Sequence, residues 1–251
     1  MLHPLVIFDA GFTLIRPRET LADALHRALN DHGHQATMDE IQRAWEAADA
    51  WFWENYHRPD NQTWTSDERI EETWRSYHRL MLDHLGVPDV GQELMETILA
   101  GQFSHESWEP YPEAVEALER ARAEGSKVAI ASDWGSTLPD VIRGVGLADY
   151  IDIWVVSAIE GVAKPSPEFF RRAAERAGVL PAQAVMIGDS YRADVLGARS
   201  AGMDAVLLDR NGHAAADVEG PVADSLTAAL DLAASLAAAR AADAPADWPV
   251  R

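Results

Sequence analysis

Short apolar runs alternate with helical patterns over most of the chain. The first run, Leu5 to Phe8, leads into a polar residue and a glycine and predicts a buried strand followed by a turn. Three similar runs come much later: Val128 to Ala131, Ala184 to Ile187 and Ala205 to Leu208. Segments with helical spacing lie among them, several with proline near the start and glycine after the end: Pro112 to Glu124, Thr137 to Val145, Pro167 to Ala177 and Ala193 to Ala201. The alternation predicts an α/β fold with a doubly wound, Rossmann-like parallel sheet.

A long segment without a convincing strand separates the first two predicted strands. It contains four helical patterns: Glu19 to Asp31, Met38 to Tyr56, Ser66 to Leu85 and Gln92 to Phe103. We therefore predict a helical cap over residues 18–107, a core over residues 1–17 and 108–241, and a flexible tail over 242–251. Aromatic residues are frequent in this insert, and we expect one group of them to form the core of its helices: Trp51, Phe52, Trp53 and Tyr56.

Composition and charge limit the classes of function. The formal net charge of -20 argues against nucleic-acid binding, which needs a basic surface against the phosphates. The absence of cysteine excludes thiolate catalysis and cysteine-ligated zinc, so a metal would have oxygen or imidazole ligands. No apolar run approaches the ~20 residues that cross a bilayer, and the first residues lack the features of a signal peptide. We expect a cytoplasmic protein that acts on a small, anionic molecule, with no membrane or nucleic-acid partner.

Polar side chains gather where the predicted strands end. Six of them lie at or shortly after a strand end or in a loop that opens a helix: Asp9, Ser132, Asp133, Lys164, Asp189 and Asp194. Ligands of open parallel sheets bind outside the carboxyl ends of the strands, near the point where strand order reverses. Lys164 is one of only two lysines in the chain, so its place in this group is informative. The sequence therefore predicts a functional site at this edge of the sheet.

Four motifs occur in order along the chain. The first is an aspartate with a threonine four residues later, Asp9-Ala10-Gly11-Phe12-Thr13. The other three are Ser132 after an apolar strand, Lys164-Pro165, and Gly188-Asp189-Ser190 with Asp194. Gly197-Ala198 and Ala201-Gly202-Met203 follow. In this order and at these spacings the motifs resemble those of the haloacid dehalogenase superfamily, in the branch with a helical cap after the first core strand. The resemblance extends over the chain except its tail.

The resemblance implies a magnesium-dependent hydrolase, most simply a phosphatase for a small phosphate monoester. Asp9 would attack phosphorus and form an aspartyl-phosphate that water then hydrolyses. Mg²⁺ would be held by Asp9, Asp189 and the backbone carbonyl of Gly11, with Asp194 as a further ligand or a support.

The resemblance also implies roles for the residues around the nucleophile. Ser132 and the region of Thr13 would hydrogen-bond the phosphoryl oxygens, and Lys164 would neutralise negative charge. The residues expected to contact the substrate are Gly11, Phe12, Ser132, Asp133, Trp134 and Lys164.

Gly11 departs from the pattern of the family's phosphatases. They usually carry a second aspartate at this position, which protonates the leaving alkoxide and later activates water. General acid–base catalysis of this kind raises the rate ~10²–10⁴-fold, so its loss should lower turnover of alkyl phosphates. Four residues are candidates to replace it: Asp133, His57, His78 and His105. A positive φ at Gly11 would oppose its replacement by aspartate.

Of three other functions, two remain open at this point and the phosphonate hydrolase is disfavoured. A hydrolase that attacks carbon, like the haloacid dehalogenases, also lacks the second acid, but those enzymes dispense with metal and do not keep Gly188-Asp189-Ser190. A phosphonate hydrolase needs a lysine in the insert for a Schiff base, and residues 18–107 contain none. In the third case Gly11 marks the decay of an active site into a phosphate-binding protein.

Overall fold

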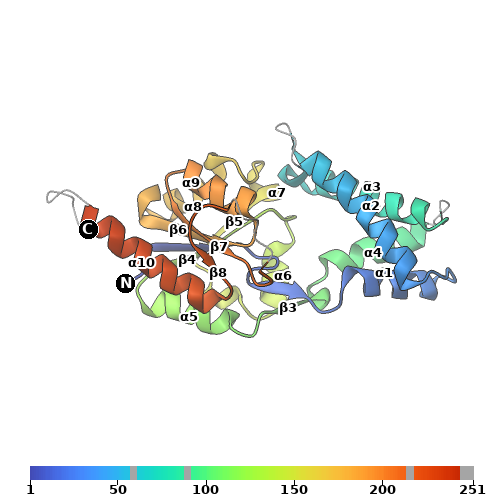
Figure 1. The fold of residues 1–251 in the computed structure, drawn as a ribbon, viewed down its shortest axis with the longest axis horizontal. Coiled ribbons are helices and arrows are strands. Elements are labelled where there is room, and N and C mark those ends of the chain that lie inside the picture. Colours follow the sequence, from blue (N-terminus) through green and yellow to red (C-terminus); the bar gives the residue numbers. More distant parts are fainter. Residues whose placement is uncertain (57–60, 88–91, 213–217, 244–251) are drawn as a thin grey trace.

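Six parallel strands form the central sheet of the protein. The computed structural model describes residues 1–56, 61–87, 92–212 and 218–243. The strands are β1 (Leu5–Phe8), β4 (Lys127–Ser132), β5 (Ile153–Val156), β6 (Ala184–Gly188), β7 (Asp204–Leu208) and β8 (Val222–Ala223). Their order in the sheet is β5-β4-β1-β6-β7-β8, and all five pairings are parallel. The four strands predicted from apolar runs are β1, β4, β6 and β7, and the predicted α/β class is confirmed (Figure 1).

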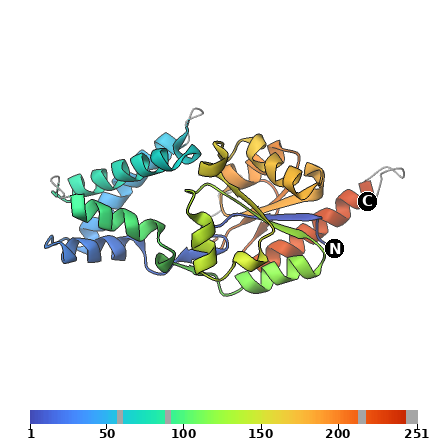
Figure 2. The ribbon, with the colours of Figure 1, turned by 180° about the vertical axis from the view of Figure 1, so that it is seen from behind.

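Helices cover both faces of this sheet, as Figures 1 and 2 show from opposite sides. The helices on one face are α5 (Ala114–Ala123), α6 (Leu138–Gly144) and α10 (Leu226–Asp243); on the other they are α8 (Pro167–Ala177) and α9 (Gly197–Ser200). Alternate residues of β1 enter the two apolar cores, with Val6 and Phe8 in one and Leu5 and Ile7 in the other. Burial on both sides explains why these strands appear as continuous apolar runs.

A separate group of helices lies beside the sheet. It consists of α1 (Leu21–Asp31), α2 (Met38–Tyr56), α3 (Asp67–His84) and α4 (Gln92–Phe103). These helices share an apolar core of their own, in which Leu29, Ile41 and Leu82 are completely buried. We refer to residues 18–107 as the helical insert.

Two of the described places where the insert meets the rest of the protein are its chain ends and the start of α3. Strands β2 (Ile15–Pro17) and β3 (Trp108–Pro110) pair antiparallel, so the chain leaves and re-enters the core through one short ribbon. At the other place the Asp67 carboxylate, at the start of α3, accepts hydrogen bonds from the Ser136 backbone N–H at 2.7 Å and hydroxyl at 2.5 Å. The ribbon lies where the predicted insert begins and ends.

Several elements differ from the sequence-based expectation. Strands β2, β3, β5 and β8 were not expected, and the helix expected from Ala193 begins as a π-helix over Tyr191–Leu196 before α9. At the chain end α10 continues to Asp243, two residues into the predicted tail, and the rest of that tail lies outside the described residues. None of the described helices is long and apolar enough to span a bilayer.

Candidate active site

The order of the strands places the candidate site beside β1 and β6. From β1 the chain builds the sheet outward through β4 and β5, then returns to the other side of β1 and builds outward through β6, β7 and β8. Asp9 follows β1 and Asp189 follows β6, and the Asp9 backbone N–H donates to the Ile187 carbonyl at 3.0 Å. The two carboxylates therefore lie at the switch point of the sheet, where ligands of doubly wound folds bind.

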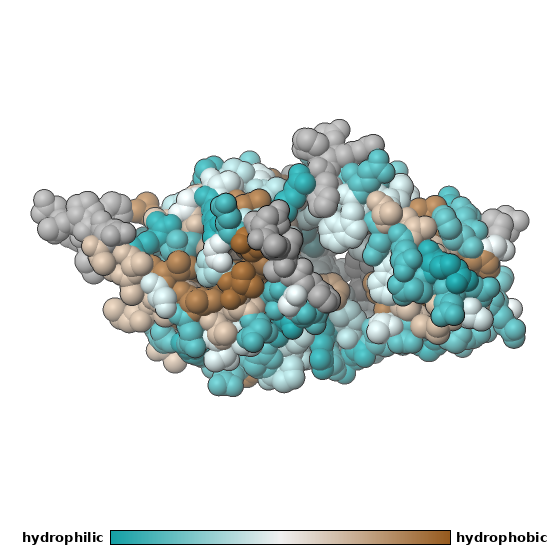
Figure 3. All heavy atoms as spheres, in the orientation of Figure 1, coloured by the Kyte–Doolittle hydropathy of each residue, from teal (hydrophilic) through white to brown (hydrophobic). Residues whose placement is uncertain are grey.

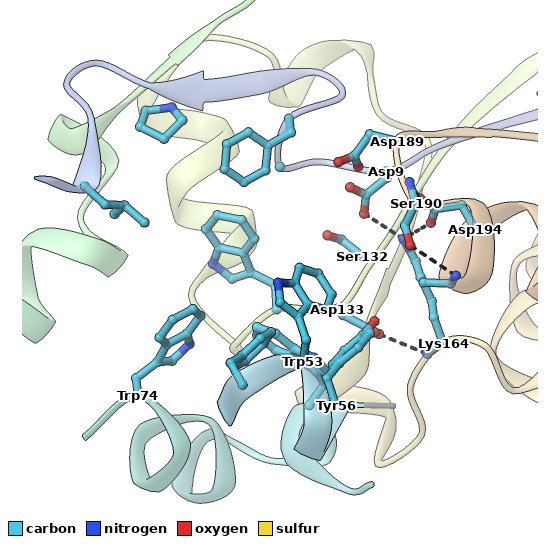
Figure 4. A pocket seen from close by; sticks show the side chains of 18 of the residues that line it. Asp9, Trp53, Tyr56, Trp74, Ser132, Asp133, Lys164, Asp189, Ser190 and Asp194 are labelled. Atoms are coloured by element: carbon cyan, nitrogen blue, oxygen red, sulfur yellow. Dashed lines mark hydrogen bonds and ion pairs between the residues drawn. The ribbon is translucent and has the colours of Figure 1, made fainter. Parts of the chain in front are cut away.

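A buried lysine joins two of the aspartates. The Lys164 ammonium donates to Asp9 Oδ1 at 2.6 Å and to Asp194 Oδ1 at 2.5 Å, as Figure 4 shows. The Lys164 side chain is 3% exposed, and those of Asp9 and Asp194 are 12% and 1% exposed. Buried charges of this kind are stable only when paired, so the three side chains hold one another in place.

Local packing brings Asp194 into this cluster. Its other oxygen, Oδ2, accepts from the Ser190 backbone N–H at 2.9 Å. The π-helix that carries Asp194 presses the carboxylate against Gly188, where a Cβ would lie 2.3 Å from Asp194 Cγ. Only glycine permits this approach, and π-helical turns are frequent at functional sites.

Electrostatics keep Lys164 charged. Burial alone would lower its pKa, but the negative charges of Asp194, Asp9 and Asp133 outweigh that effect and raise it above the ordinary lysine value. Burial also raises the pKa of Asp194, which Lys164 partly offsets. Direct contact between the ammonium of Lys164 and the carboxylate of Asp194 stabilises the charged form of both groups.

Asp189 completes a group of three carboxylates that suits a divalent cation. One oxygen of each of Asp9, Asp189 and Asp194 lies within 4.8 Å of the others, and Asp189 is the exposed member. The pKa of Asp189 is raised by partial loss of solvent and then by the charges of Asp9 and Asp194. Three carboxylates against one ammonium leave two negative charges, which one divalent ion neutralises. Oxygen ligands at an open edge are the set that Mg²⁺ prefers.

Thr13 lies behind Asp189. Its hydroxyl, fully buried, donates to Asp189 Oδ1 at 3.4 Å, and the residue is not part of the cavity lining. Thr13 is therefore placed to orient Asp189, and its expected contact with phosphoryl oxygens stays a prediction.

Ser132 and Asp133 end strand β4 at the same edge. Ser132 is buried and lines the cavity beside Asp9 (Figure 4). Asp133 Oδ1 accepts from the Lys164 backbone N–H at 3.0 Å, which fixes the loop that carries the lysine, whereas its Oδ2 is buried without a hydrogen-bond partner. Burial raises the pKa of Asp133 to about 7 despite the nearby Lys164 charge. Asp133 thus braces the loop, and its burial favours the protonated form.

Trp134 occupies the space that a side chain at position 11 would need. A Cβ on Gly11 would lie 3.2 Å from Trp134 Cζ3, closer than ordinary contact. The positive φ that we expected at Gly11 is instead at Phe12, where φ is 56°. The obstacle to an aspartate at position 11 is therefore the indole ring. Phe12 sits in a strained backbone region, as residues at functional sites often do.

A cavity of about 240 Å³ opens above these residues. Its floor contains Asp9, Ser132, Lys164, Asp189 and Asp194, and the surface is hollowed between core and insert in Figure 3. The expected substrate contacts Gly11, Phe12, Asp133 and Trp134 also line it. The structure thus brings together all the predicted site residues except Thr13, which lies just behind.

The insert contributes more to the cavity than we expected. Phe52, Trp53 and Tyr56 line it, although we assigned them to the core of the helices. Phe52 and Tyr56 do both, since Phe52 lies in that core and Tyr56 packs against it. Trp51 packs only against the core. The aromatic spacing along α2 was the available signal, but periodicity does not say which face the site occupies.

Two of the histidines considered as replacement acids lie elsewhere. His78 is buried among the insert helices and His105 is exposed near α6, and neither lines the cavity. His57 lies outside the described residues. Among the described candidates, Asp133 alone reaches the cavity.

Comparisons with known proteins identify the family of the chain. A family model described as haloacid dehalogenase-like hydrolase matches residues 3–202. The chain belongs to the haloacid dehalogenase-like hydrolases. It is 28% identical over 213 residues to haloacid dehalogenase-like hydrolase domain-containing protein 3 of Danio rerio, covering 82% of this chain and 84% of that protein.

Two further relatives extend the comparison. The chain is 36% identical over 129 residues to phosphoserine phosphatase of Thermus thermophilus, covering 50% of this chain and 49% of that protein. The crystal structure of the putative HAD-hydrolase YfnB from Bacillus subtilis, bound to magnesium, matches with a TM-score of 0.74 at 20% identity, covering 94% of this chain and 100% of that one. At that identity the likeness concerns the fold.

Proposed function

We propose that this hydrolase is a magnesium-dependent phosphatase that acts on small phosphate monoesters. The observation that carries the proposal is the cluster of Asp9, Asp189 and Asp194 around one lysine, whose excess negative charge calls for a divalent cation. Hydrolases of the family that attack carbon do without that cation. The name of the Thermus relative, a phosphoserine phosphatase, supports the same reaction.

Asp9 is the nucleophile in this proposal. Its carboxylate attacks phosphorus, the bond between phosphorus and the leaving oxygen breaks, and water then hydrolyses the aspartyl-phosphate. Lys164 holds Asp9 through its 2.6 Å contact and compensates charge on the transferring group. Ser132 donates its hydroxyl to a phosphoryl oxygen.

The metal site in this proposal consists of Asp9, Asp189 and the backbone carbonyl of Gly11. Asp194 supports it, because both its oxygens already accept hydrogen bonds. Bound Mg²⁺ supplies positive charge that stabilises the phosphoryl oxygens. We further propose that the helical insert is a cap domain, since it walls the cavity opposite Asp9.

A substrate and metal screen tests this function. We expect purified protein to release phosphate from para-nitrophenyl phosphate with Mg²⁺ present, and to stop when the ion is chelated. We also expect no release of halide from 2-haloacids. Halide release that persists in chelator, without phosphatase activity, would instead identify an enzyme that attacks carbon.

Restoring the missing acid tests the role of Gly11. Because Trp134 fills the space, we expect Gly11→Asp alone to be strained and the double variant Gly11→Asp/Trp134→Ala to accommodate the carboxyl. Compared with Trp134→Ala, the double variant should have a kcat/KM for alkyl phosphates that is higher by up to ~10²–10⁴-fold. Its kcat/KM for para-nitrophenyl phosphate should barely change, because that leaving group needs little protonation.

Asp133 determines the size of that gain. If Asp133 already donates the proton to the leaving group, Gly11→Asp should raise kcat/KM only slightly. In that case Asp133→Asn in the otherwise natural protein should lower activity on alkyl phosphates. Equal gains on both substrate types in fully folded variants would show that leaving-group protonation is not what the enzyme lacks.

A further inference from the structure

The wall of the cavity away from the charged floor is aromatic. The insert contributes Phe52, Trp53, Tyr56, Trp64 and Trp74 to the lining. Figure 4 shows Trp53, Tyr56 and Trp74 opposite the aspartates. Phe52 stacks on both Tyr56 and Trp74, at centroid distances of 5.7 and 5.5 Å, so these rings form one continuous surface.

A second aromatic surface begins beside the nucleophile. Trp134 lies over Gly11, two residues from Asp9, and meets Trp108 edge-on at 4.9 Å. Phe12 meets Trp108 at 6.1 Å and is 49% exposed. A leaving group attached to phosphorus at Asp9 would therefore extend between aromatic side chains of the core and of the insert.

The described lining residues provide no unpaired positive charge for a second anionic group on the substrate. Within the described part of the chain, Lys164 is the one cationic residue in the lining, and its ammonium is already paired with Asp9 and Asp194. A carboxylate or second phosphate on the leaving group would lose its hydration among aromatic rings without a counter-ion, at high cost.

Three of the tryptophans in the lining carry an uncharged polar group that lacks a hydrogen-bond partner. The indole N–H groups of Trp64, Trp74 and Trp134 are buried without an acceptor. An indole N–H donates hydrogen bonds and carries no charge, so these groups provide no counter-ion for an anionic substituent. This favours a ring system with neutral substituents.

We propose that the substrate is the phosphate monoester of an uncharged aromatic hydroxyl compound, whose ring binds between Trp134 and the aromatic side chains of α2 and α3. This inference rests on the proposed phosphatase function. An Asp9 oxygen bonds to phosphorus, the bond from phosphorus to the aryl oxygen breaks, and the aryloxide leaves with the electron pair and takes its proton from solvent. An aryloxide is a stable anion, so this reaction suits a site in which Gly11 stands in place of an acid.

Binding of non-hydrolysable phosphonates tests the inference apart from turnover. We expect 1-naphthylmethylphosphonate to bind the magnesium-loaded protein at least ~10-fold more tightly than phosphonoacetate, measured by titration calorimetry. Trp53→Ala should weaken naphthyl binding about 3- to 10-fold through loss of one aromatic partner, and should leave phosphonoacetate unchanged. Trp53 is 49% exposed, so the variant should fold.

Trp45→Ala is the matched control. Trp45 lies on the same helix but packs against the insert core and does not line this cavity, so its variant should bind both phosphonates as the natural protein does. Equal or tighter binding of phosphonoacetate, or unchanged naphthyl binding in Trp53→Ala, overturns the inference. If the protein preferred the naphthyl ligand but hydrolysed no phosphate ester, the aromatic ligand class would stand and the phosphatase function would be contradicted. If it hydrolysed phosphate esters with Mg²⁺ but did not prefer the naphthyl ligand, the phosphatase function would stand and the aromatic ligand class would be contradicted.

Discussion

Asp9→Asn is expected to abolish hydrolysis of para-nitrophenyl phosphate, with a loss of kcat on the order of 10⁴-fold or more. Asparagine preserves the shape of the side chain but removes the charge that attacks phosphorus. The fold should survive, because Lys164 keeps its 2.5 Å ion pair with Asp194 and one of the crowded negative charges disappears. Steady-state kinetics and urea unfolding of the same preparation measure the two effects.

Asp204→Asn is a matched control for that variant. The Asp204 side chain is 15% exposed, close to the 12% of Asp9, and it also accepts hydrogen bonds at 2.7 Å, from the Arg240 guanidinium and the His3 imidazole. It lies at the start of β7, away from the cavity. The variant should lose stability and keep its activity. If Asp9→Asn and Asp204→Asn had equal activities, Asp9 would not be the nucleophile.

Lys164→Met is expected to remove activity and to destabilise the fold by about 3–5 kcal/mol, the usual result of removing one member of a buried charge pair. Without the ammonium, Asp9 and Asp194 remain buried next to each other and to Asp189 with no positive charge between them. Urea unfolding should show the loss, and Mg²⁺ should restore more stability to this variant than to the natural protein.

The chain supplies its own control, because it has only one other lysine. Lys127, exposed at the start of β4, donates to the Ala177 carbonyl at 2.8 Å, far from the site. Lys127→Met should change stability by less than about 1 kcal/mol and leave kcat/KM unchanged. A Lys164→Met protein as stable and active as Lys127→Met would contradict the ion-pair cluster.

The strands that were predictable from sequence are those buried on both faces. β1, β4, β6 and β7 are central in the sheet or next to a central strand, and so appear as uninterrupted apolar runs. β5 is also a short apolar run, but it was missed because it passes directly into the helix α7 (Ser157–Glu160) without a turn signal. The ribbon of β2 and β3 has three residues in each strand, too few for a periodic pattern.

The charged floor of the site was predictable for a different reason. Its residues follow strands, and the carboxyl ends of parallel strands lie at the same edge of a sheet. Sequence position alone therefore predicted that Asp9, Ser132 and Asp189 lie together. The aromatic wall depends on how the insert lies against the core, which no local pattern encodes. The contact between Trp134 and Gly11 likewise joins residues 123 positions apart.

Detection of the covalent intermediate tests the central claim most directly. With Gly11 in place of the residue that activates water, hydrolysis of the aspartyl-phosphate should be slow enough for it to accumulate after a good leaving group departs. We predict that protein quenched in acid during turnover of para-nitrophenyl phosphate with Mg²⁺ carries one phosphoryl group on the peptide that contains Asp9, by mass spectrometry. Turnover with no phosphoryl group on that peptide, or with the group on another residue, would contradict the account.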